Sequence, residues 1–163
     1  MIVVADTSVL LNLARVARVD LLPVLFGDVF IPPEVAEEFQ WQARSNPRFS
    51  GVDLPGWLHT RSASSVPPWV GEAPGLDRGE TMALALAAEL HADAVLMDET
   101  AGRNAAEHHG LHVIGVLGIL VRAKRLGHLN RVGPILDALR TDAGFWIGES
   151  LHQRVLRTAG ELP

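Results

Sequence analysis

The sequence contains no cysteine among its 163 residues. This absence excludes a disulfide framework, a thiolate metal site and a cysteine nucleophile, and it fits a reducing cytoplasm. Long hydrophobic runs are missing as well. The longest apolar stretch, 113–121, has nine residues and includes two glycines, whereas a membrane span needs about 18 residues. The apolar run before Asp6 is too short for a signal peptide, so we expect a cytoplasmic protein with no membrane partner.

Common ligand-binding patterns are also scarce. His108 and His109 are adjacent and diverge on a helix, and His112 lies beyond Gly110 in the next segment. No histidine pair is therefore expected on one helical face, where a zinc site would need it. The sequence has neither a phosphate-binding P-loop nor a dinucleotide-binding glycine motif.

Charge is distributed unevenly along the chain. The net charge of −5 argues against a protein that coats nucleic acid through many Lys and Arg side chains. Residues 1–99 carry 14 acidic and 6 basic side chains, and residues 100–163 carry 5 acidic and 8 basic ones. This asymmetry indicates either an acidic site beside a basic flank or basic residues that solvate helix ends, where cations are favoured. The residues concerned are Arg122, Lys124, Arg125 and Arg131.

Short apolar runs alternate with segments of helical spacing, a pattern typical of crossover units around a parallel sheet. A hydrophobic content of 48% at this length suits a single domain over residues 1–163. The pattern predicts five strands, at residues 2–5, 28–31, 57–61, 94–98 and 112–115.

The stretch 40–75 contains five of the ten prolines and is predicted to be mostly irregular. Three tryptophans lie in or beside it. They either anchor a long loop to the core or offer a surface to bases or a protein partner. From about 141 to 163 we expect a C-terminal extension that ends in a helix. The tryptophans are Trp41, Trp57 and Trp69.

Two aspartates follow predicted buried strands directly. Asp6 comes after 2–5 and Asp98 closes 94–98, at the carboxyl ends where open α/β sheets place their ligands. If the two strands are neighbours, about 4.8 Å apart, the carboxylates converge. Such close like charges require a proton or a cation, and an all-oxygen ligand set favours Mg²⁺ or Mn²⁺. The alternative for each is an N-cap of the following helix.

Further acids occur at helix starts. Glu34 and Glu38 share one helical face, whereas Glu37 points elsewhere. Asp77 and Glu80 are three residues apart and have the spacing of a capping box, so they are either functional acids or a structural cap.

The ordered motifs closely resemble those of PIN-domain proteins, in particular the compact VapC-like nucleases of prokaryotes. The segments that carry the resemblance are DTSVLLNLA, IPPEVAEEF, LDRGETMALALA and LMDETAGRNAAEHHGLHVIGVLGILVRAKRLG, and together they span roughly residues 2–140. The resemblance implies a three-layer α/β/α fold with a central parallel sheet, in which four acids hold Mg²⁺ or Mn²⁺ for the cleavage of RNA.

By position, the resemblance implies that Asp6, Glu38, Glu80 and Asp98 are the catalytic and metal-binding acids. The nearby hydroxyls of Thr7 and Ser8 would orient an acid or a water. The family usually has aspartate as its third acid, so Asp77 stays an alternative to Glu80. Glu99 stands where a second aspartate often follows the fourth acid, as ligand or bystander. Arg103 either touches a substrate phosphate or forms a surface salt bridge.

The expected function is therefore that of a metal-dependent endoribonuclease, the toxin of a type II toxin-antitoxin pair. The resemblance also implies a cognate antitoxin and a homodimer, and the candidate contact surface is formed by the three tryptophans above with Phe145 and Trp146. Two alternatives remain open. One is a degenerate PIN-like module that binds RNA or protein without cutting. The other is a haloacid-dehalogenase-like phosphatase, although Ser8 stands where its second acid would be required.

Overall fold

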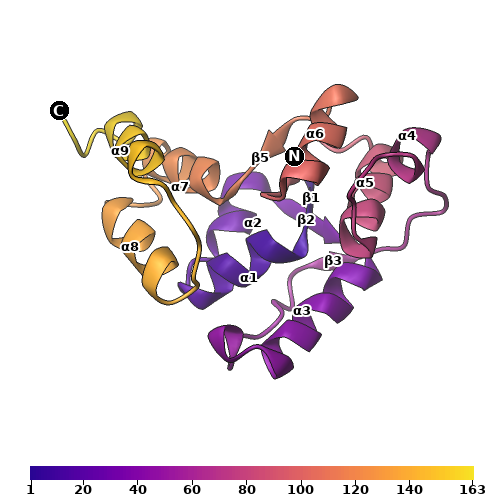
Figure 1. Ribbon diagram of the computed structural model, residues 1–163, viewed down its shortest axis with the longest axis horizontal. Helices are drawn as coiled ribbons and strands as arrows, with labels where there is room; N and C mark the ends of the chain where they lie inside the picture. The colour runs from indigo at the N-terminus through magenta and orange to yellow at the C-terminus, as the bar shows by residue number, and fades with distance from the viewer.

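Five parallel strands form one sheet at the centre of the computed structural model, which describes residues 1–163. Their order across the sheet is β3-β2-β1-β4-β5 (Figure 1). The strands are β1 (Ile2–Ala5), β2 (Asp28–Ile31), β3 (His59–Thr60), β4 (Ala94–Leu96) and β5 (Val113–Ile114). The predicted α/β class with a five-stranded parallel sheet is thus confirmed.

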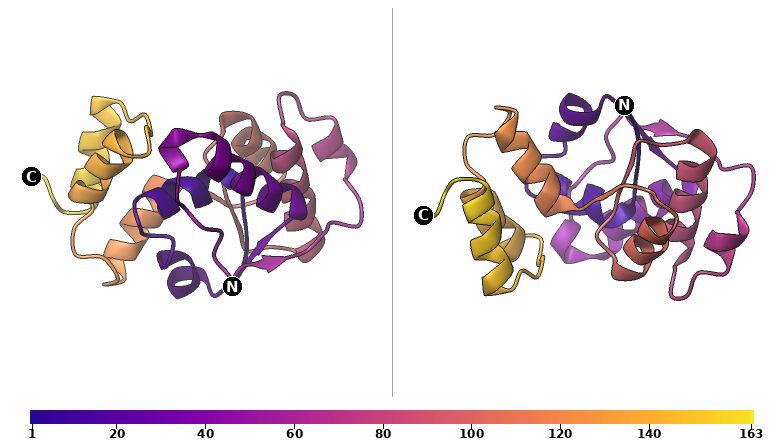
Figure 2. Two further views of the ribbon diagram at one scale, coloured as in Figure 1. Left: turned by 90° about the horizontal axis from the view of Figure 1, so that it is seen from below. Right: turned by 90° about the horizontal axis from the view of Figure 1, so that it is seen from above.

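The chain has nine helices, and those that cover the two faces of the sheet complete a three-layer α/β/α arrangement (Figures 1 and 2). The last two lie beyond α7, away from the sheet (Figure 1). No helix combines the length and the apolar character needed to span a bilayer. The helices are α1 (Thr7–Arg15), α2 (Leu21–Phe26), α3 (Pro33–Ser45), α4 (Pro68–Gly71), α5 (Arg78–Leu90), α6 (Thr100–His108), α7 (Val116–Arg125), α8 (Gly133–Thr141) and α9 (Glu149–Thr158).

Strand ends differ from the prediction. The first two strands have the expected bounds, but β4 stops at Leu96, so Asp98 lies beyond the strand rather than at its last position. The backbone stops pairing with the neighbouring strands after Leu96 and turns into α6, which begins at Thr100. The strand expected at 57–61 is reduced to two exposed residues at the sheet edge, where only one neighbour, β2, supplies hydrogen bonds.

The stretch 40–75 is less irregular than predicted. Helix α3 continues to Ser45, because its apolar face, which includes the buried Val35 and Phe39, starts a regular helix that no breaker interrupts before Asn46 and Pro47. A short 3₁₀ helix (Pro47–Phe49), β3 and α4 then follow. In the C-terminal part, residues 142–148 form no strand and lead directly into α9.

The strand order reverses between β1 and β4, and this switch positions the candidate site. The two strands pair in parallel, with Val3 opposite Ala94 and Ala5 opposite Leu96. Every residue of β4 is buried, as is β1 from Val3 onwards, as expected for parallel strands covered on both faces. The carboxyl ends of both strands therefore open on the same edge, where ligands bind in such sheets.

Candidate active site

Asp6 is a buried acid without a compensating cation. It is the first residue after β1 and is only 3% exposed. Its backbone N–H donates to the carbonyl of Leu96 at 2.9 Å, which fixes it beside β4. It occupies the N-cap position of α1, but its carboxylate makes no capping hydrogen bond. No Lys, Arg or His side chain lies within 4 Å of its carboxylate. The alternative of a simple helix cap therefore does not account for this carboxylate.

Glu38 approaches the same region from α3. The hydroxyl of Thr7 donates to Oε2 of Glu38 at 3.0 Å, which links the first residue of α1 to α3. Gly79, in the first turn of α5, allows this approach, because a Cβ there would lie 2.7 Å from the same Oε2. Glu37 is exposed, as predicted from its position on the helix. The side chain of Glu38 is thus held between α1 and α5.

Asp77 and Glu80 form the capping box that their spacing predicts. Oδ1 of Asp77 accepts from the N–H of Glu80 at 2.7 Å, and Oε2 of Glu80 accepts from the N–H of Asp77 at 2.9 Å. The structural reading is therefore confirmed. However, Asp77 is exposed, whereas Glu80 is only 4% exposed. A glutamate can complete a capping box while it is exposed to solvent. The capping box therefore does not explain why Glu80 is buried.

These acids act on one another electrostatically. Burial raises the pKa of Asp6 to about 7, and the charges of Glu80, Asp77 and Glu38 add to this shift while the N–H of Thr7 opposes it. Burial also raises the pKa of Glu38 and of Glu80, and in both cases nearby acids contribute. We refer to Asp6, Glu38, Asp77 and Glu80 as the acid cluster. The structure therefore brings together four of the predicted side chains, from the end of β1, from α3 and from the start of α5.

Glu99 lies at the rim of this cluster. Its charge contributes to the raised pKa of Glu38, of Glu80 and of Asp98. It is exposed and occupies the N-cap position of α6. Glu99 is thus the acid that faces both the cluster and Asp98.

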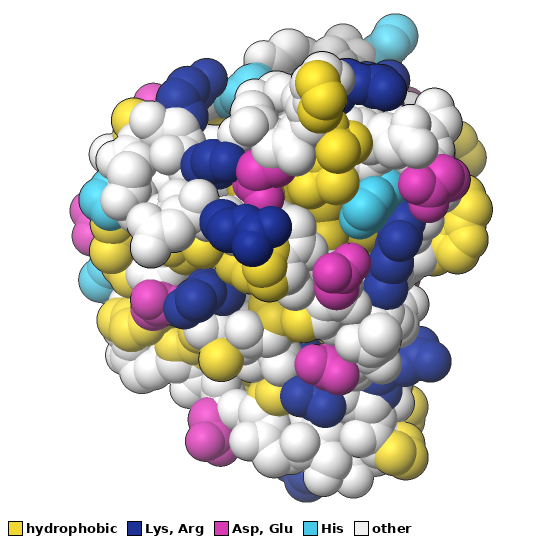
Figure 3. Space-filling view, turned by 90° about the vertical axis from the view of Figure 1, so that its left-hand side faces the viewer, with side chains coloured by type: hydrophobic (Ala, Val, Ile, Leu, Met, Phe, Trp, Pro, Cys, Tyr) yellow, Lys and Arg dark blue, Asp and Glu magenta, His cyan; other side chains and the backbone are white.

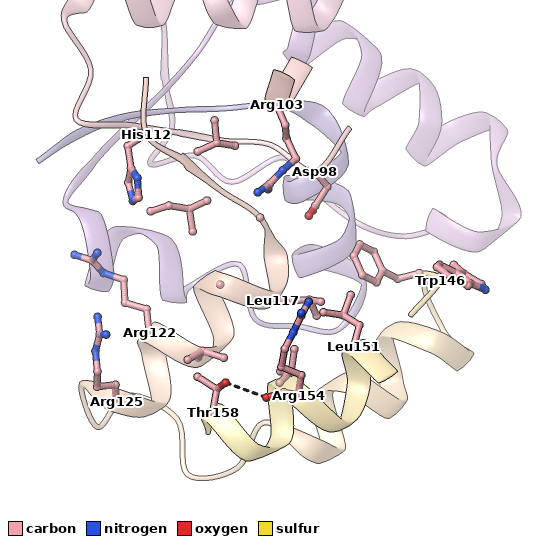
Figure 4. Close-up of a pocket in the computed structure, with 17 residues that line it drawn as sticks. Asp98, Arg103, His112, Leu117, Arg122, Arg125, Trp146, Leu151, Arg154 and Thr158 are labelled. Carbon is pink, nitrogen blue, oxygen red and sulfur yellow. Dashed lines mark hydrogen bonds between the residues drawn. The ribbon is translucent and has the colours of Figure 1, made fainter. Parts of the chain in front are cut away.

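Asp98 is oriented differently from Asp6. Both of its carboxylate oxygens lie 3.3 Å from the N–H of Val116, the first residue of α7. Arg103 lies beside it (Figure 4) and lowers its pKa, but burial outweighs these effects and raises the pKa to about 6. The charges that act on Asp6 are those of the other three cluster acids. Asp98 thus lies two residues beyond β4, the neighbour of β1, with its carboxylate turned toward α7.

The donor set fits a hard divalent cation. The site offers only carboxylate and hydroxyl oxygens, which Mg²⁺ and Mn²⁺ prefer. The hydroxyl of Ser8 is buried without a hydrogen-bond partner, which indicates that a polar ligand belongs beside it. No three acidic or histidine side chains converge tightly enough to hold an ion as they stand.

Sequence comparison now supplies the family. A family model described as a PIN domain matches residues 2–161. The chain belongs to the PIN-domain family. No curated protein matched the chain. PIN domains are generally nucleases, so this PIN domain belongs with hydrolases of nucleic acids, and the alternative of a haloacid-dehalogenase-like phosphatase does not fit its family.

Some features of this PIN domain were beyond the reach of sequence reasoning. The contact of Asp98 with the start of α7 depends on how β5 places that helix. Gly79 and Gly115 were not singled out, yet each lies directly against a site carboxylate: Gly79 against Glu38, and Gly115 against Asp98. Both glycines lie at helix starts, where most other residues would serve the helix equally well. A glycine at such a position is a sequence signal that the backbone there lies close to another group.

Proposed function

We propose that this PIN domain is a divalent-metal-dependent endoribonuclease that hydrolyses RNA phosphodiester bonds. One observation supports this most directly: Asp6 is almost fully buried and faces three other acids, with no cationic side chain near it. A structural carboxylate would be expected to have a partner, because an unpaired buried charge costs several kcal/mol. A divalent cation bound beside Asp6 would neutralise this charge.

The residues that would hold the ion are Asp6 and Asp98, with Glu38 and Glu80 binding directly or through water. Asp77 and Glu99 would add negative charge around the ion, since both act on Glu38 and Glu80. A Mg²⁺ or Mn²⁺ ion held there would supply Lewis acidity for the attack of water on a phosphodiester.

The other residues position these acids. Thr7 orients Glu38 through its hydroxyl, and the backbone N–H of Asp77 orients Glu80. The N–H of Val116 fixes Asp98. Arg103 donates to the carbonyl of Met97 at 3.2 Å, which places its guanidinium beside Asp98, where it can attract a substrate phosphate.

The test is cleavage of mixed RNA with and without Mg²⁺. We expect the wild type to cut only with the metal, and Asp6→Asn to lose activity by at least about 100-fold. Glu38→Gln should also lower cleavage. Its matched control is Glu37→Gln, which removes the same charge one residue away on an exposed face. Equal cleavage by the wild type and Asp6→Asn would overturn the proposal. RNA binding without any cleavage would instead support a non-catalytic PIN module.

We further propose that the enzyme is a toxin that forms a homodimer and is inhibited by a small cognate antitoxin. Exposed tryptophans support this, since Trp41 is 57% and Trp146 is 85% exposed, and exposed aromatic residues are enriched in interfaces. Sedimentation of the purified chain tests the dimer. Growth arrest on expression, relieved by coexpression of a neighbouring small gene, tests the toxin. Monomeric sedimentation or unimpaired growth would contradict the corresponding part.

A further inference from the structure

A groove of about 690 Å³ lies between α7, α9 and the end of β4. Asp98 lines it, together with several apolar side chains (Figure 4). Five of these apolar side chains are Val113, Leu117, Val121, Leu151 and Val155. The face made by the C-terminal helices shows Lys and Arg side chains around apolar patches (Figure 3).

Cationic side chains dominate the polar part of this groove. Arg103, Arg122, Arg125 and Arg154 all line it, and Asp98 is its only carboxylate. Figure 4 shows Arg154 reaching from α9 toward the space that Asp98 and Arg103 border, while Arg122 and Arg125 project from α7. Four arginines line this one groove, although the chain as a whole has a net charge of −5. They form a local positive field on an acidic protein.

Three of these arginines have no acidic partner. No carboxylate lies within 4 Å of Arg122, Arg125 or Arg154, whereas Arg103 pairs with Glu107 at 3.7 Å. Arg122 is held over the ring of Phe26, 5.1 Å from its centre, and its buried Nε has no hydrogen-bond acceptor. Unneutralised guanidinium groups that share one groove indicate an anionic ligand.

On the basis of the nuclease function above, we propose that this groove binds the phosphate backbone of the single-stranded RNA substrate next to the cleaved bond. Continuity with the site favours RNA over an acidic peptide, since Asp98 and Arg103 belong to both. Arginines would contact phosphates, and the apolar side chains that line the groove would accept sugars and bases. Trp146, highly exposed at the side of the groove, offers a ring on which a base stacks.

The decisive experiment measures binding of a fluorescein-labelled 12-nucleotide oligouridylate RNA by the full chain in EDTA, where cleavage is blocked. The test variant is Arg125→Gln with Arg154→Gln. The control is Arg18→Gln with Arg157→Gln, which removes the same charge from exposed positions without ion pairs and outside the groove. Because all four positions are exposed, both proteins should fold, and circular dichroism checks this.

We expect the test variant to weaken RNA binding about tenfold at 50 mM NaCl and to reduce the slope of log K against log salt by about 1.4, or 0.7 for each lost phosphate contact. The control variant should change the RNA affinity and the salt slope by less than half as much as the test variant does. RNA should quench the fluorescence of the wild type more than that of Trp146→Phe. Equal losses in the test and control variants would overturn the proposal.

Two further outcomes are informative. If the test variant retains RNA affinity but loses binding of a labelled polyglutamate peptide, the groove is a protein-binding site and the proposal is wrong. If the groove variants lose RNA affinity while no metal-dependent cleavage is found with the wild type, the groove proposal stands and the nuclease proposal fails. Binding in EDTA and cleavage in Mg²⁺ therefore separate the two.

Discussion

Thr7 and Glu38, 31 residues apart in the sequence, are joined by a hydrogen bond of 3.0 Å from the threonine hydroxyl to the carboxylate. Thr7 is itself buried, so its hydroxyl has a defined direction. The bond connects the helix that starts beside Asp6 to the helix that carries Glu38. The position of one acid thus depends on a residue adjacent to another.

Replacement of Thr7 by Val removes this bond with little change in shape. We expect RNA cleavage to fall about 10- to 100-fold, as is usual when the group that orients a metal ligand is lost. The free energy of unfolding should fall by only about 1 kcal/mol. Thr7→Ser keeps the hydroxyl and should restore most of the activity. An activity loss in Thr7→Ser as large as that in Thr7→Val would contradict this, because serine keeps the hydroxyl that orients Glu38.

Stability should depend on pH through Asp6. Its pKa of about 7 in the folded protein is above that of an unfolded aspartate, so the folded state retains a proton that the unfolded state loses. Stability therefore falls as pH rises from about 4 to 7. In EDTA, the free energy of unfolding of Asp6→Asn should exceed that of the wild type by on the order of 4 kcal/mol at pH 8, and the two should match near pH 4. Urea unfolding at both pH values measures this.

The control for the pH experiment is Asp53→Asn, which removes a charge from an exposed position. Its stability should follow that of the wild type at every pH. If Asp6→Asn instead loses stability at pH 8, the carboxylate has a favourable partner when ionised, and the view of Asp6 as an uncompensated acid is wrong.

Divalent cations should stabilise the fold. At Mg²⁺ tenfold above its dissociation constant, binding to the folded state contributes about 1.4 kcal/mol, which corresponds to a rise in Tm of about 3–6 °C for a chain of this size. Thermal unfolding of the wild type in EDTA and in Mg²⁺ tests this. The rise should be absent in Asp6→Asn. A rise of the same size in both proteins would mean that Mg²⁺ acts elsewhere.

Glu161 should be important for the stability of the C-terminal helices. Its carboxylate accepts from the N–H of Val132 at 2.7 Å and of Gly133 at 3.0 Å, and it lies 2.9 Å from Nζ of Lys124. Burial raises its pKa, but these contacts outweigh burial and keep the pKa below its usual range. We expect Glu161→Gln to lower the free energy of unfolding by about 1–3 kcal/mol at pH 7.

This contribution is lost as pH falls below the ordinary pKa of glutamate and through the lowered one, so wild type and Glu161→Gln should converge in acid. Glu149→Gln is the matched control, because Glu149 is 72% exposed and 3.9 Å from Arg140; it should change stability by less than about 0.5 kcal/mol. Chemical unfolding of the three proteins at pH 7 and pH 3.5 measures these differences in the free energy of unfolding. A loss for Glu161→Gln that persists undiminished at pH 3.5 would contradict the electrostatic explanation.

The sequence sufficed where a local pattern determines the outcome. The apolar runs at 2–5 and 28–31 gave β1 and β2 with the right bounds, and the spacing of Asp77 and Glu80 gave the capping box. The condition on which Asp6 and Asp98 were expected to lie close, that their two strands are neighbours, is met in the sheet, although neither aspartate is among the charges that shift the pKa of the other. The PIN-like order of motifs pointed to the family that the comparison supports.

The rest depended on tertiary structure. Nothing near Asp98 in the sequence signals that its carboxylate meets the N–H of Val116, since β5 and the chain between them set that distance. Likewise Arg125 and Arg154 are 29 residues apart, and only the packing of α9 against α7 places them in one groove. Which acids bind metal stays a prediction, because carboxylates can rotate toward an ion.

Gly79 brings the backbone of α5 directly against the carboxylate of Glu38. A single methyl group at this position would meet the tip of a flexible side chain rather than the core, so the fold would tolerate it while Glu38 moved aside. Position 79 thus offers a way to make a protein that is folded yet misaligned at one acid. Such a variant would be useful for capturing binding partners of the folded protein while the site around Glu38 is disturbed.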